Sequence, residues 1–346
     1  MTVEDIADTI RLMASERRNR APASDPASAA PRLTAMASTP SGSPAVASPD
    51  PRPTGAQYAI SHGDHAAVVT EQGATLRAYA VAGRPIINGF GEDQVPQAYQ
   101  GMQLMPWPNR IRDGRWQHDG ATQQLAISEP DRATALHGLV NWPDWTLLEH
   151  TAETVSQRHV LRPQQGWPGT LVLSVRHRVN DEGLRIEVSA ENIGSVTVPF
   201  GYAAHPYFAV GDTSLDHSSL SLPADQYLVV DAERLLPIEL APVTGDVDLR
   251  AGEPLGARTL DTAYTGLATH DGVWTARLDT PQGRTEIWAG AGFDWSQVYT
   301  SEDRQWLAIE PMTCGPDGFN GGQVAAGLIT LEPGAHWQGS WGIRGY

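Results

Sequence analysis

Glu310 is placed where a carboxylate could serve as a general base. It lies in the stretch 306–311, which reads WLAIEP. If this stretch is a strand, Leu307 and Ile309 share one face and Glu310 projects from the other, beside a small residue. A Gly- and Pro-rich loop follows at 312–322, and functional groups are often found where such loops leave a rigid strand. Alone, the pattern fits a structural ion pair as well as a general base.

His205 lies in a second unusual stretch, 198–208, which reads VPFGYAAHPYF. Histidine is the side chain best suited to give and take protons near neutral pH. Pro206 directly after it is expected to end a strand. The neighbouring aromatic rings could stack on the apolar CH face of a pyranose ring.

Asn109 and Arg110 follow two prolines in the stretch 105–114, MPWPNRIRDG. The prolines favour an extended backbone. An Arg side chain presents a rigid fork of donors that suits several hydroxyl or carboxylate oxygens. This context favours a fixed position for Arg110, whereas Arg112 could equally be a solvated surface residue.

His137 and Asp261 carry weaker signals. His137 lies in the apolar run 135–140, where a buried imidazole needs a hydrogen-bond partner. The adjacent Gly138 lets another backbone or a ligand approach closely. Taken alone, His137 is more typical of a core histidine than of a functional one, and Asp261 fits an ordinary turn or cap residue.

Two other polar clusters are better explained as turns. Residues 62–65 read HGDH and could hold a metal ion, but they fall in a turn near the start of the folded part. Residues 180–182 form a carboxylate-rich hairpin end. We therefore expect no metal site.

Composition excludes several classes of function. The 346 residues carry a formal net charge of −16, which argues against nucleic acid and anionic membranes as partners. The chain has no Lys, which excludes Schiff-base chemistry and Lys-dependent nucleotide loops. Its single cysteine, Cys314, rules out an internal disulfide and fits a reducing cytoplasm. No apolar run is long enough to cross a membrane.

The elements that must position these residues are strands. Residues 171–179 and 184–190 alternate apolar and polar side chains, which predicts a hairpin of half-buried strands. Residues 115–117 and 121–127 flank an Asp-Gly turn and predict another. Further strands are expected at 66–70, 75–81, 226–230, 273–278, 284–288, 295–299, 306–310, 328–331 and 336–343. This pattern predicts a single all-β domain over 56–346, a sandwich or barrel.

Residues 1–55 differ in composition from the rest. The stretch 21–55 is dominated by Ala, Pro, Ser and Thr, and has too few large apolar residues to repay the entropy of ordering. We expect a disordered tail, with a possible short helix at 3–18 and Met36 as an alternative start. No hydrophobic segment follows Arg17 and Arg18, so an export signal is not expected.

Together, these stretches resemble the aldose 1-epimerase family, also called galactose mutarotases. The resemblance runs from about residue 57 to the C-terminus and keeps the family's order: Asn-Arg-Ile at 109–111, Leu-His-Gly at 136–138, His-Pro-Tyr-Phe at 205–208, Leu-Asp at 260–261 and Glu-Pro at 310–311. It implies a galactose-mutarotase-like antiparallel β-super-sandwich with an open cleft. It also implies that Glu310 is the general base and His205 the general acid.

The same resemblance implies that Arg110, His137, Asp261 and Asn109 hold the hydroxyls of a free aldose such as glucose or galactose, with no cofactor. A non-catalytic sugar-binding protein on the same fold is the alternative, because fold does not fix function. A glycoside hydrolase would normally need two carboxylates flanking the bond. A sugar phosphate also stays open as a substrate, since Arg112 and Arg115 lie close to Arg110 in sequence.

Overall fold

The structure, a computed structural model, describes residues 49–346. The helix expected at 3–18, the alternative start at Met36 and most of the expected tail at 1–55 lie outside the described residues. Among the residues described, no helix is long and apolar enough to span a bilayer.

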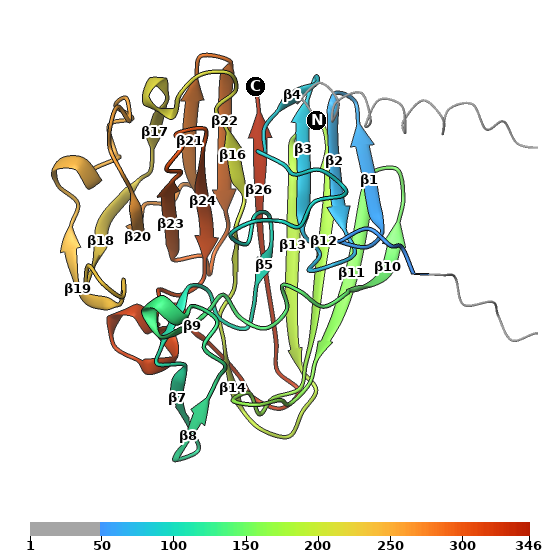
Figure 1. The fold of residues 1–346 in the computed structure, drawn as a ribbon, viewed down its shortest axis with the longest axis vertical. Coiled ribbons are helices and arrows are strands. Elements are labelled where there is room, and N and C mark those ends of the chain that lie inside the picture. The colour runs from blue at the N-terminus through green and yellow to red at the C-terminus, as the bar shows by residue number, and fades with distance from the viewer. Residues whose placement is uncertain (1–48) are drawn as a thin grey trace, which may run out of the picture.

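One large antiparallel sheet of eight strands lies at the centre of the fold (Figure 1). The C-terminal strand β26 lies between β13 and β22, so the last residues of the chain join the two halves of this sheet. In spatial order its strands are β10 (Thr146–His150), β11 (Thr154–Leu161), β12 (Leu171–Asn180), β13 (Gly183–Asn192), β26 (His336–Gly345), β22 (Gly283–Ala289), β21 (Trp274–Thr280) and β17 (Ser219–Ser221).

A second sheet carries most of the candidate site. Its order is β19 (Pro237–Pro242), β18 (Ala224–Val230), β20 (Asp261–Leu267), β23 (Trp295–Thr300), β24 (Trp306–Met312), β15 (Ala203–Ala204) and β5 (Gln103–Leu104), and β16 (Tyr207–Ala209) also pairs with β24. A third sheet contains β1 (Gln57–His62), β2 (His65–Thr70), β3 (Leu76–Val81) and β4 (Arg84–Pro85).

Short pairs and single turns of 3₁₀ helix complete the described chain. The pairs are β6 (Arg110–Arg112) with β9 (Thr134–Leu136), β7 (Arg115–His118) with β8 (Ala121–Gln124), and β14 (Val198–Phe200) with β25 (Ile329–Leu331). The 3₁₀ turns are η1 (Pro130–Arg132), η2 (Leu215–His217), η3 (Gly245–Val247), η4 (Gly318–Asn320) and η5 (Gln323–Ala325).

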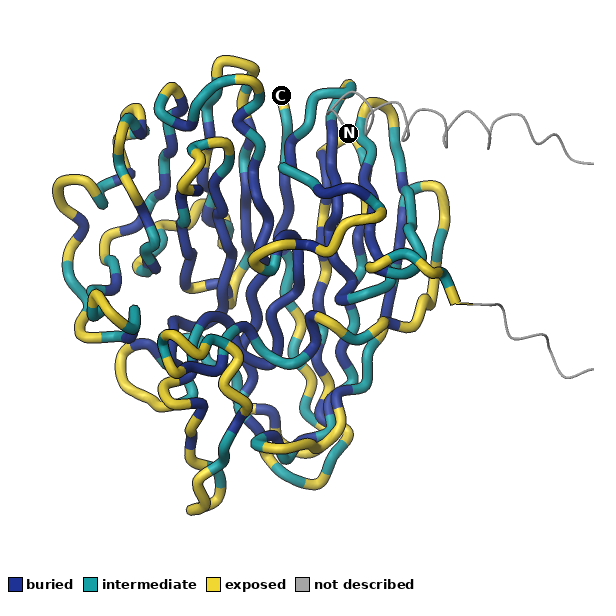
Figure 2. Tube along the Cα trace, viewed as in Figure 1, coloured by how far each residue is buried: buried dark blue, intermediate teal, exposed yellow. Residues whose placement is uncertain are grey.

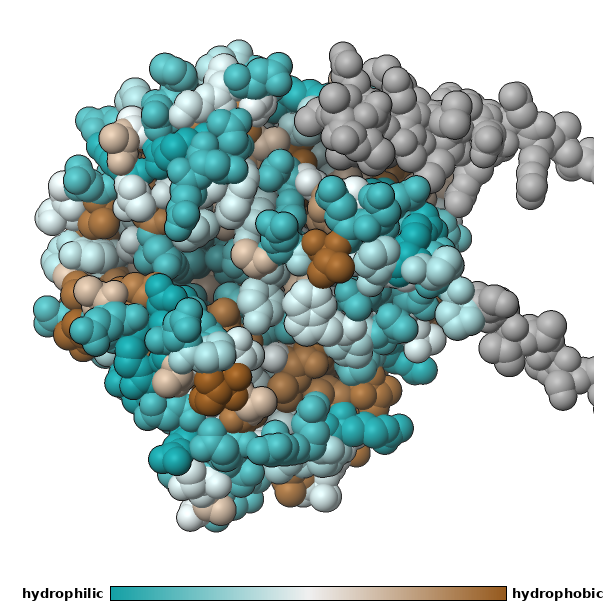
Figure 3. Space-filling model, viewed as in Figure 1, coloured by the Kyte–Doolittle hydropathy of each residue, from teal (hydrophilic) through white to brown (hydrophobic). Residues whose placement is uncertain are grey.

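The large sheet is covered on one face by the other two sheets. Strands β1 and β2 pack against β11, β12 and β13, and β24 packs against β22. Every second residue of β12 is buried, as the alternation of 171–179 predicts. Buried residues follow the central strands, and exposed residues gather in the turns (Figure 2). The surface in this view is largely hydrophilic, with hydrophobic residues in separate patches (Figure 3).

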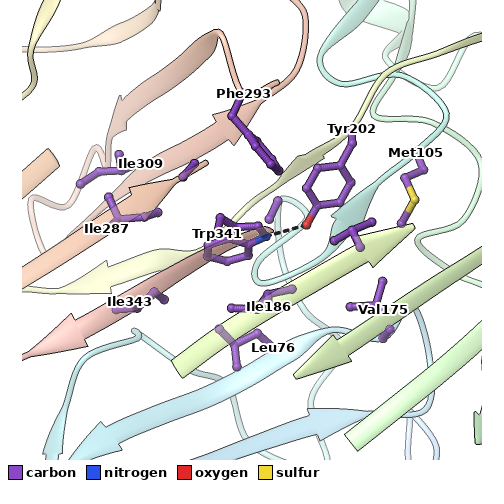
Figure 4. Packing of buried hydrophobic residues seen from close by; sticks show 14 of the residues in the cluster. Leu76, Met105, Val175, Ile186, Tyr202, Ile287, Phe293, Ile309, Trp341 and Ile343 are labelled. Carbon is purple, nitrogen blue, oxygen red and sulfur yellow. Dashed lines mark hydrogen bonds between the residues drawn. The ribbon is translucent and has the colours of Figure 1, made fainter. Parts of the chain in front are cut away.

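Tyr202 links the layers of the core through its hydroxyl (Figure 4). The indole Nε1 of Trp341, on the large sheet, donates to Tyr202 Oη at 2.8 Å. Tyr202 Oη in turn donates to Oε1 of Gln103, on the second sheet, at 2.7 Å. All three side chains are buried, so each polar atom in this relay replaces a water contact that folding removed.

The prediction of a single all-β domain is confirmed, and so are most of the predicted strands. The Asp-Gly hairpin is present: Asp119 and Gly120 both have positive φ, 48° and 76°, as a tight two-residue turn requires. The prediction that Glu310 ends its strand is wrong. Strand β24 continues to Met312, because Met312 pairs with Trp295 on one side and Ala203 on the other.

Residues 62–65, HGDH, form the turn of the hairpin between β1 and β2, and the imidazoles of both histidines contact other side chains. His62 contacts Glu153 through Nδ1 at 3.0 Å and Asp181 through Nε2 at 2.8 Å. His65 contacts the hydroxyl of Tyr79 at 2.8 Å. The interpretation as a turn therefore agrees with the contacts.

Candidate active site

Three neighbouring strands bring Asp261, Gln297 and Glu310 onto one face of the second sheet. Gln297 on β23 is the register partner of Glu310 on β24. Asp261 opens β20, the next strand, and accepts a hydrogen bond from Gln297 Nε2 at 2.6 Å. Asp261 is thus a strand residue, not the turn residue that it resembles when taken alone. Gln297 was not predicted from the sequence.

Strand β24 separates the core from the site. Leu307 and Ile309 are buried in the main hydrophobic cluster, and Glu310 projects from the opposite face together with Ala308. The predicted alternation is confirmed.

His205 lies in the short link between β15 and β16. Its backbone is fixed on both sides: its N–H donates to Met102 O at 3.0 Å, and its carbonyl accepts from Gly101 N at 2.8 Å. His205 Nε2 then lies 3.4 Å from Glu310 Oε1. The side chains are 9% and 3% exposed, so the pair is almost closed to bulk water.

His137 and Asn109 hold each other in place. Asn109 N–H donates to His137 Nδ1 at 3.1 Å, and His137 N–H donates to Asn109 O at 2.8 Å. Because Nδ1 accepts, the proton of a neutral His137 is assigned to Nε2. The His137 ring meets the His205 ring edge-on, with centroids 5.2 Å apart. The buried imidazole of His137 therefore has the hydrogen-bond partner that it needs, and its ring also lies beside His205.

Both residues adopt a strained backbone. Asn109 has φ of 54° and His137 has φ of 61°, in the left-handed region that side chains other than Gly usually avoid. Strained conformations of this kind cost roughly 1–3 kcal/mol each and concentrate at functional sites. The reciprocal hydrogen bonds between the two residues stabilise this arrangement.

Arg110 is held by Glu129, a residue that the sequence did not point to. Arg110 Nε donates to Glu129 Oε2 at 2.8 Å, and Nη2 donates to Oε1 at 3.0 Å. Glu129 Oε2 also accepts from Thr134 Oγ1 at 2.7 Å. A bidentate pair of this kind fixes the plane of the guanidinium and compensates its charge.

Burial shifts the pKa values of the central groups in opposite directions. The pKa of Glu310 lies well above its ordinary value, first because of burial and then because of the nearby charge of Asp261, with Arg110 opposing. Burial lowers the pKa of His205 to about 4. Burial, followed by the charges of His205 and Arg110, also lowers the pKa of His137 well below 6.5. Burial therefore disfavours the charged forms of both Glu310 and His205.

Three atoms of the site lack a hydrogen-bond partner among residues 49–346. They are Glu310 Oε2, His205 Nδ1 and Gln297 Oε1, and all are buried. Buried polar groups are usually paired, and these three exceptions lie on Glu310 and on two of its neighbours. A carboxyl and an imidazole at 3.4 Å can exchange protons with two neighbouring oxygens of one ligand.

The other basic residues of the segment make different contacts. Arg112 lies against Asp317 with its side chain 45% exposed, and Arg115 Nε donates to Gln124 at 2.8 Å. Within the described part of the chain, no group of three or more His, Cys, Asp or Glu residues is arranged to hold a metal ion.

The fold and the site together define a class of protein. The structure is similar to that of a galactose mutarotase-like protein from Clostridium acetobutylicum, with a TM-score of 0.75 at 17% sequence identity, over 83% of this chain and 94% of that one. The protein thus has the galactose-mutarotase-like fold.

The family follows from the sequence as a whole. The family model described as Aldose 1-epimerase matches residues 56–344, so the chain belongs to the aldose 1-epimerase family. It is 33% identical over 285 residues to the uncharacterized protein YihR of Escherichia coli K12, covering 81% of this chain and 90% of that protein. It is also 30% identical over 211 residues to galactose mutarotase of Homo sapiens, covering 56% of this chain and 60% of that enzyme.

Proposed function

We propose that the protein is an aldose 1-epimerase, which interconverts the α and β anomers of a free hexose with Glu310 as base and His205 as acid. The observation that carries the proposal is the buried contact of 3.4 Å between His205 Nε2 and Glu310 Oε1, with one further polar atom on each residue that has no partner in the described part of the chain. The two oxygens that must exchange protons in mutarotation are bonded to the same carbon, C1. A base and an acid that touch each other can therefore serve both oxygens of one sugar.

The proposed reaction conserves protons in each direction. The Glu310 carboxylate takes the proton of the anomeric hydroxyl while the His205 imidazolium protonates the ring oxygen. The bond between C1 and the ring oxygen breaks, and the aldehyde carbonyl forms at C1. The aldehyde then rotates about the C1–C2 bond, and the two groups act in reverse to close the ring on the other face.

In the proposed resting state Glu310 is protonated and His205 is neutral, and this pair can reach the reactive state without exchanging protons with solvent. Protonated Glu310 with neutral His205 contains the same number of protons as the Glu310 carboxylate with the His205 imidazolium. Transfer of one proton across the contact converts the first into the second. Hydroxyls of a bound sugar, which can donate to the carboxylate, favour the ion pair.

The remaining residues would bind the sugar. We assign Arg110, His137, Asn109 and Asp261 to its hydroxyls, and add Gln297 because its buried Oε1 lacks a partner among the described residues. The substrates we expect are neutral hexoses such as glucose and galactose. The lone cysteine of the chain fits a reducing compartment, so we place this reaction in the cytoplasm.

Polarimetry on freshly dissolved α-glucose and α-galactose tests the proposal. The wild-type protein should speed the relaxation of optical rotation over the buffer blank. Glu310→Gln keeps the shape but cannot accept the proton, and should lose about 10²- to 10⁴-fold in rate. A wild-type rate in that variant would remove Glu310 from the mechanism.

His205→Asn tests whether His205 or the neighbouring His137 is the general acid. It should lose the acid step with a similar fall in rate, and an unchanged rate would transfer the role to His137. If neither sugar relaxes faster than the blank but calorimetric titration shows binding, the protein binds sugar without catalysing mutarotation.

A further inference from the structure

Two aromatic side chains extend the site beyond His137. The ring of Tyr99 packs edge-on against the His137 ring with centroids 4.6 Å apart. The Trp142 ring lies one step further out, 6.3 Å from the ring of Tyr99. Tyr99 is half-buried, whereas Trp142 is 48% exposed. The site therefore continues outward as a strip of two rings that ends in an exposed indole.

The backbone under Tyr99 is strained and tightly held. Ala98 and Tyr99 both have positive φ, 46° and 61°, which is unusual for a bulky aromatic residue. Tyr207 Oη donates to Ala98 O, and Met102 N–H donates to Tyr99 O at 3.0 Å. Met102 O in turn accepts from the backbone N–H of His205. The position of Tyr99 is thus fixed by the same segment that fixes His205.

The backbone on either side of Trp142 is also fixed. Asn141 is buried and donates from Nδ2 to Gln103 O at 3.0 Å. Pro143 O accepts from Gly73 N at 3.0 Å. An exposed indole on a fixed backbone loses little conformational freedom when it binds a ligand, which distinguishes Trp142 from an apolar residue scattered on a mobile surface loop.

The order of groups in the site indicates which part of a sugar would meet these rings. Glu310 touches His205, His205 meets His137, His137 meets Tyr99, and Tyr99 faces Trp142. In a pyranose, the order from the anomeric hydroxyl is C1, the ring oxygen, C5 and then the exocyclic C6. If Glu310 serves the anomeric hydroxyl and His205 the ring oxygen, Tyr99 and Trp142 lie on the C5 and C6 side.

We propose that Tyr99 and Trp142 form a second sugar subsite, which binds a pyranose unit joined through the C6 oxygen of the reacting aldose. This rests on the proposed function, because it takes the orientation of the sugar from the roles of Glu310 and His205. The substrate class is then reducing disaccharides with a 1→6 linkage. A strip of two rings is longer than one exocyclic carbon can cover, and aromatic faces match the apolar CH face of a pyranose.

The subsite suits a neutral unit better than an anionic one. Glu129 already compensates the charge of Arg110 through two hydrogen bonds. The two rings supply apolar contact area and no cation.

Isomaltose and maltose provide the direct test, because they differ only in whether the second glucose is joined through O6 or O4. We expect kcat/KM of the wild-type protein to be about 3- to 10-fold higher for isomaltose, the size of one aromatic stacking contact. Trp142→Ala should bring this ratio close to one, and Trp142→Phe should keep most of it. Tyr346→Ala, which removes an aromatic ring that is 64% exposed at the C-terminus, is the matched control and should leave the ratio unchanged.

A binding measurement separates this inference from the proposed function. Both disaccharides are titrated calorimetrically into Glu310→Gln, which cannot turn them over under the proposed mechanism. Tighter binding of isomaltose that is lost with Trp142→Ala supports the subsite even if the wild-type protein accelerates no sugar. Equal affinities, or a preference for maltose, overturn the subsite even if glucose mutarotation is fast.

Discussion

Glu129 offers the sharpest test of how the site is built, because it touches Arg110 but no residue of the proposed acid–base pair. We consider Glu129→Gln, which preserves shape and removes the charge. In the wild-type protein the carboxylate accepts from Arg110 at 2.8 and 3.0 Å, with side chains only 16% and 11% exposed. The amide keeps one acceptor oxygen and turns an N–H group toward another donor.

The loss follows from these contacts. A hydrogen bond to a charged group is worth about 1.5–3 kcal/mol, and the substitution removes one such bond and weakens the other. Transmitted to substrate binding through Arg110, a loss of about 1.4–2 kcal/mol corresponds to roughly 10- to 30-fold in kcat/KM. We expect most of it in KM, since Arg110 would hold hydroxyls that change little during ring opening.

The charge change has a second consequence with a defined sign. Arg110 already lowers the pKa of Glu310, and without Glu129 its positive charge is uncompensated. The pKa of Glu310 should fall, so the alkaline limb of the pH profile of kcat/KM should move to lower pH. A role for Glu129 in folding alone would lower the melting temperature but leave KM and this limb in place, and that result would refute the reasoning.

The assay is polarimetry of initial rates against sugar concentration at several pH values, with thermal melts alongside. Glu149→Gln is the matched control. Glu149 pairs with Arg176 at 3.5 Å, with both side chains nearly half exposed, and such pairs contribute little. It should change neither KM nor the pH profile.

Two further predictions concern the pH profile and the core. Under the proposed mechanism the pair shares one proton, so kcat/KM should stay high as pH falls through 6.5 and decline only near the His205 pKa of about 4. An acidic limb at pH 6.5, in polarimetric rates corrected for buffer catalysis, would contradict the argument that burial lowers this pKa. Tyr202→Phe leaves Trp341 Nε1 and Gln103 Oε1 without their shared partner, so denaturant unfolding should show a loss of about 1–3 kcal/mol, and wild-type stability would show that the relay contributes nothing.

Local patterns made most of the fold predictable. The hairpin of β12 and β13 follows from its alternating burial, and the turn between β7 and β8 follows from Asp-Gly. Several strands were not predicted, among them β1, β10, β11, β19 and β20. Strands β1 and β10 do not alternate. All but one residue of β1 are partly exposed, and most of β10 is exposed at the edge of the large sheet.

The site was predictable where one residue stands out from its neighbours and not where register decides. Glu310 and His205 are polar residues in apolar stretches, and this contrast can be read from the chain itself. Nothing in the local sequence distinguishes Gln297. It becomes part of the site because strand pairing places it opposite Glu310 and its amide donates to Asp261. Glu129 reaches Arg110 because β6 pairs with β9, and this pairing was not predicted from the sequence.

Residues with a positive φ also could not be located from the local sequence alone. Tyr99, Asn109 and His137 all adopt a positive φ, which is rare for Tyr but more common for Asn and His. The three residues lie along a single path from the surface to His205. Each such conformation costs free energy that only surrounding contacts can offset, and those contacts come from segments distant in the sequence. The residues with positive φ therefore connect His205, which was predicted from the sequence, to the rings of Tyr99 and Trp142, which were not. That continuity is the physical reason to expect that substrate selection extends outward from the proposed acid–base pair toward Trp142.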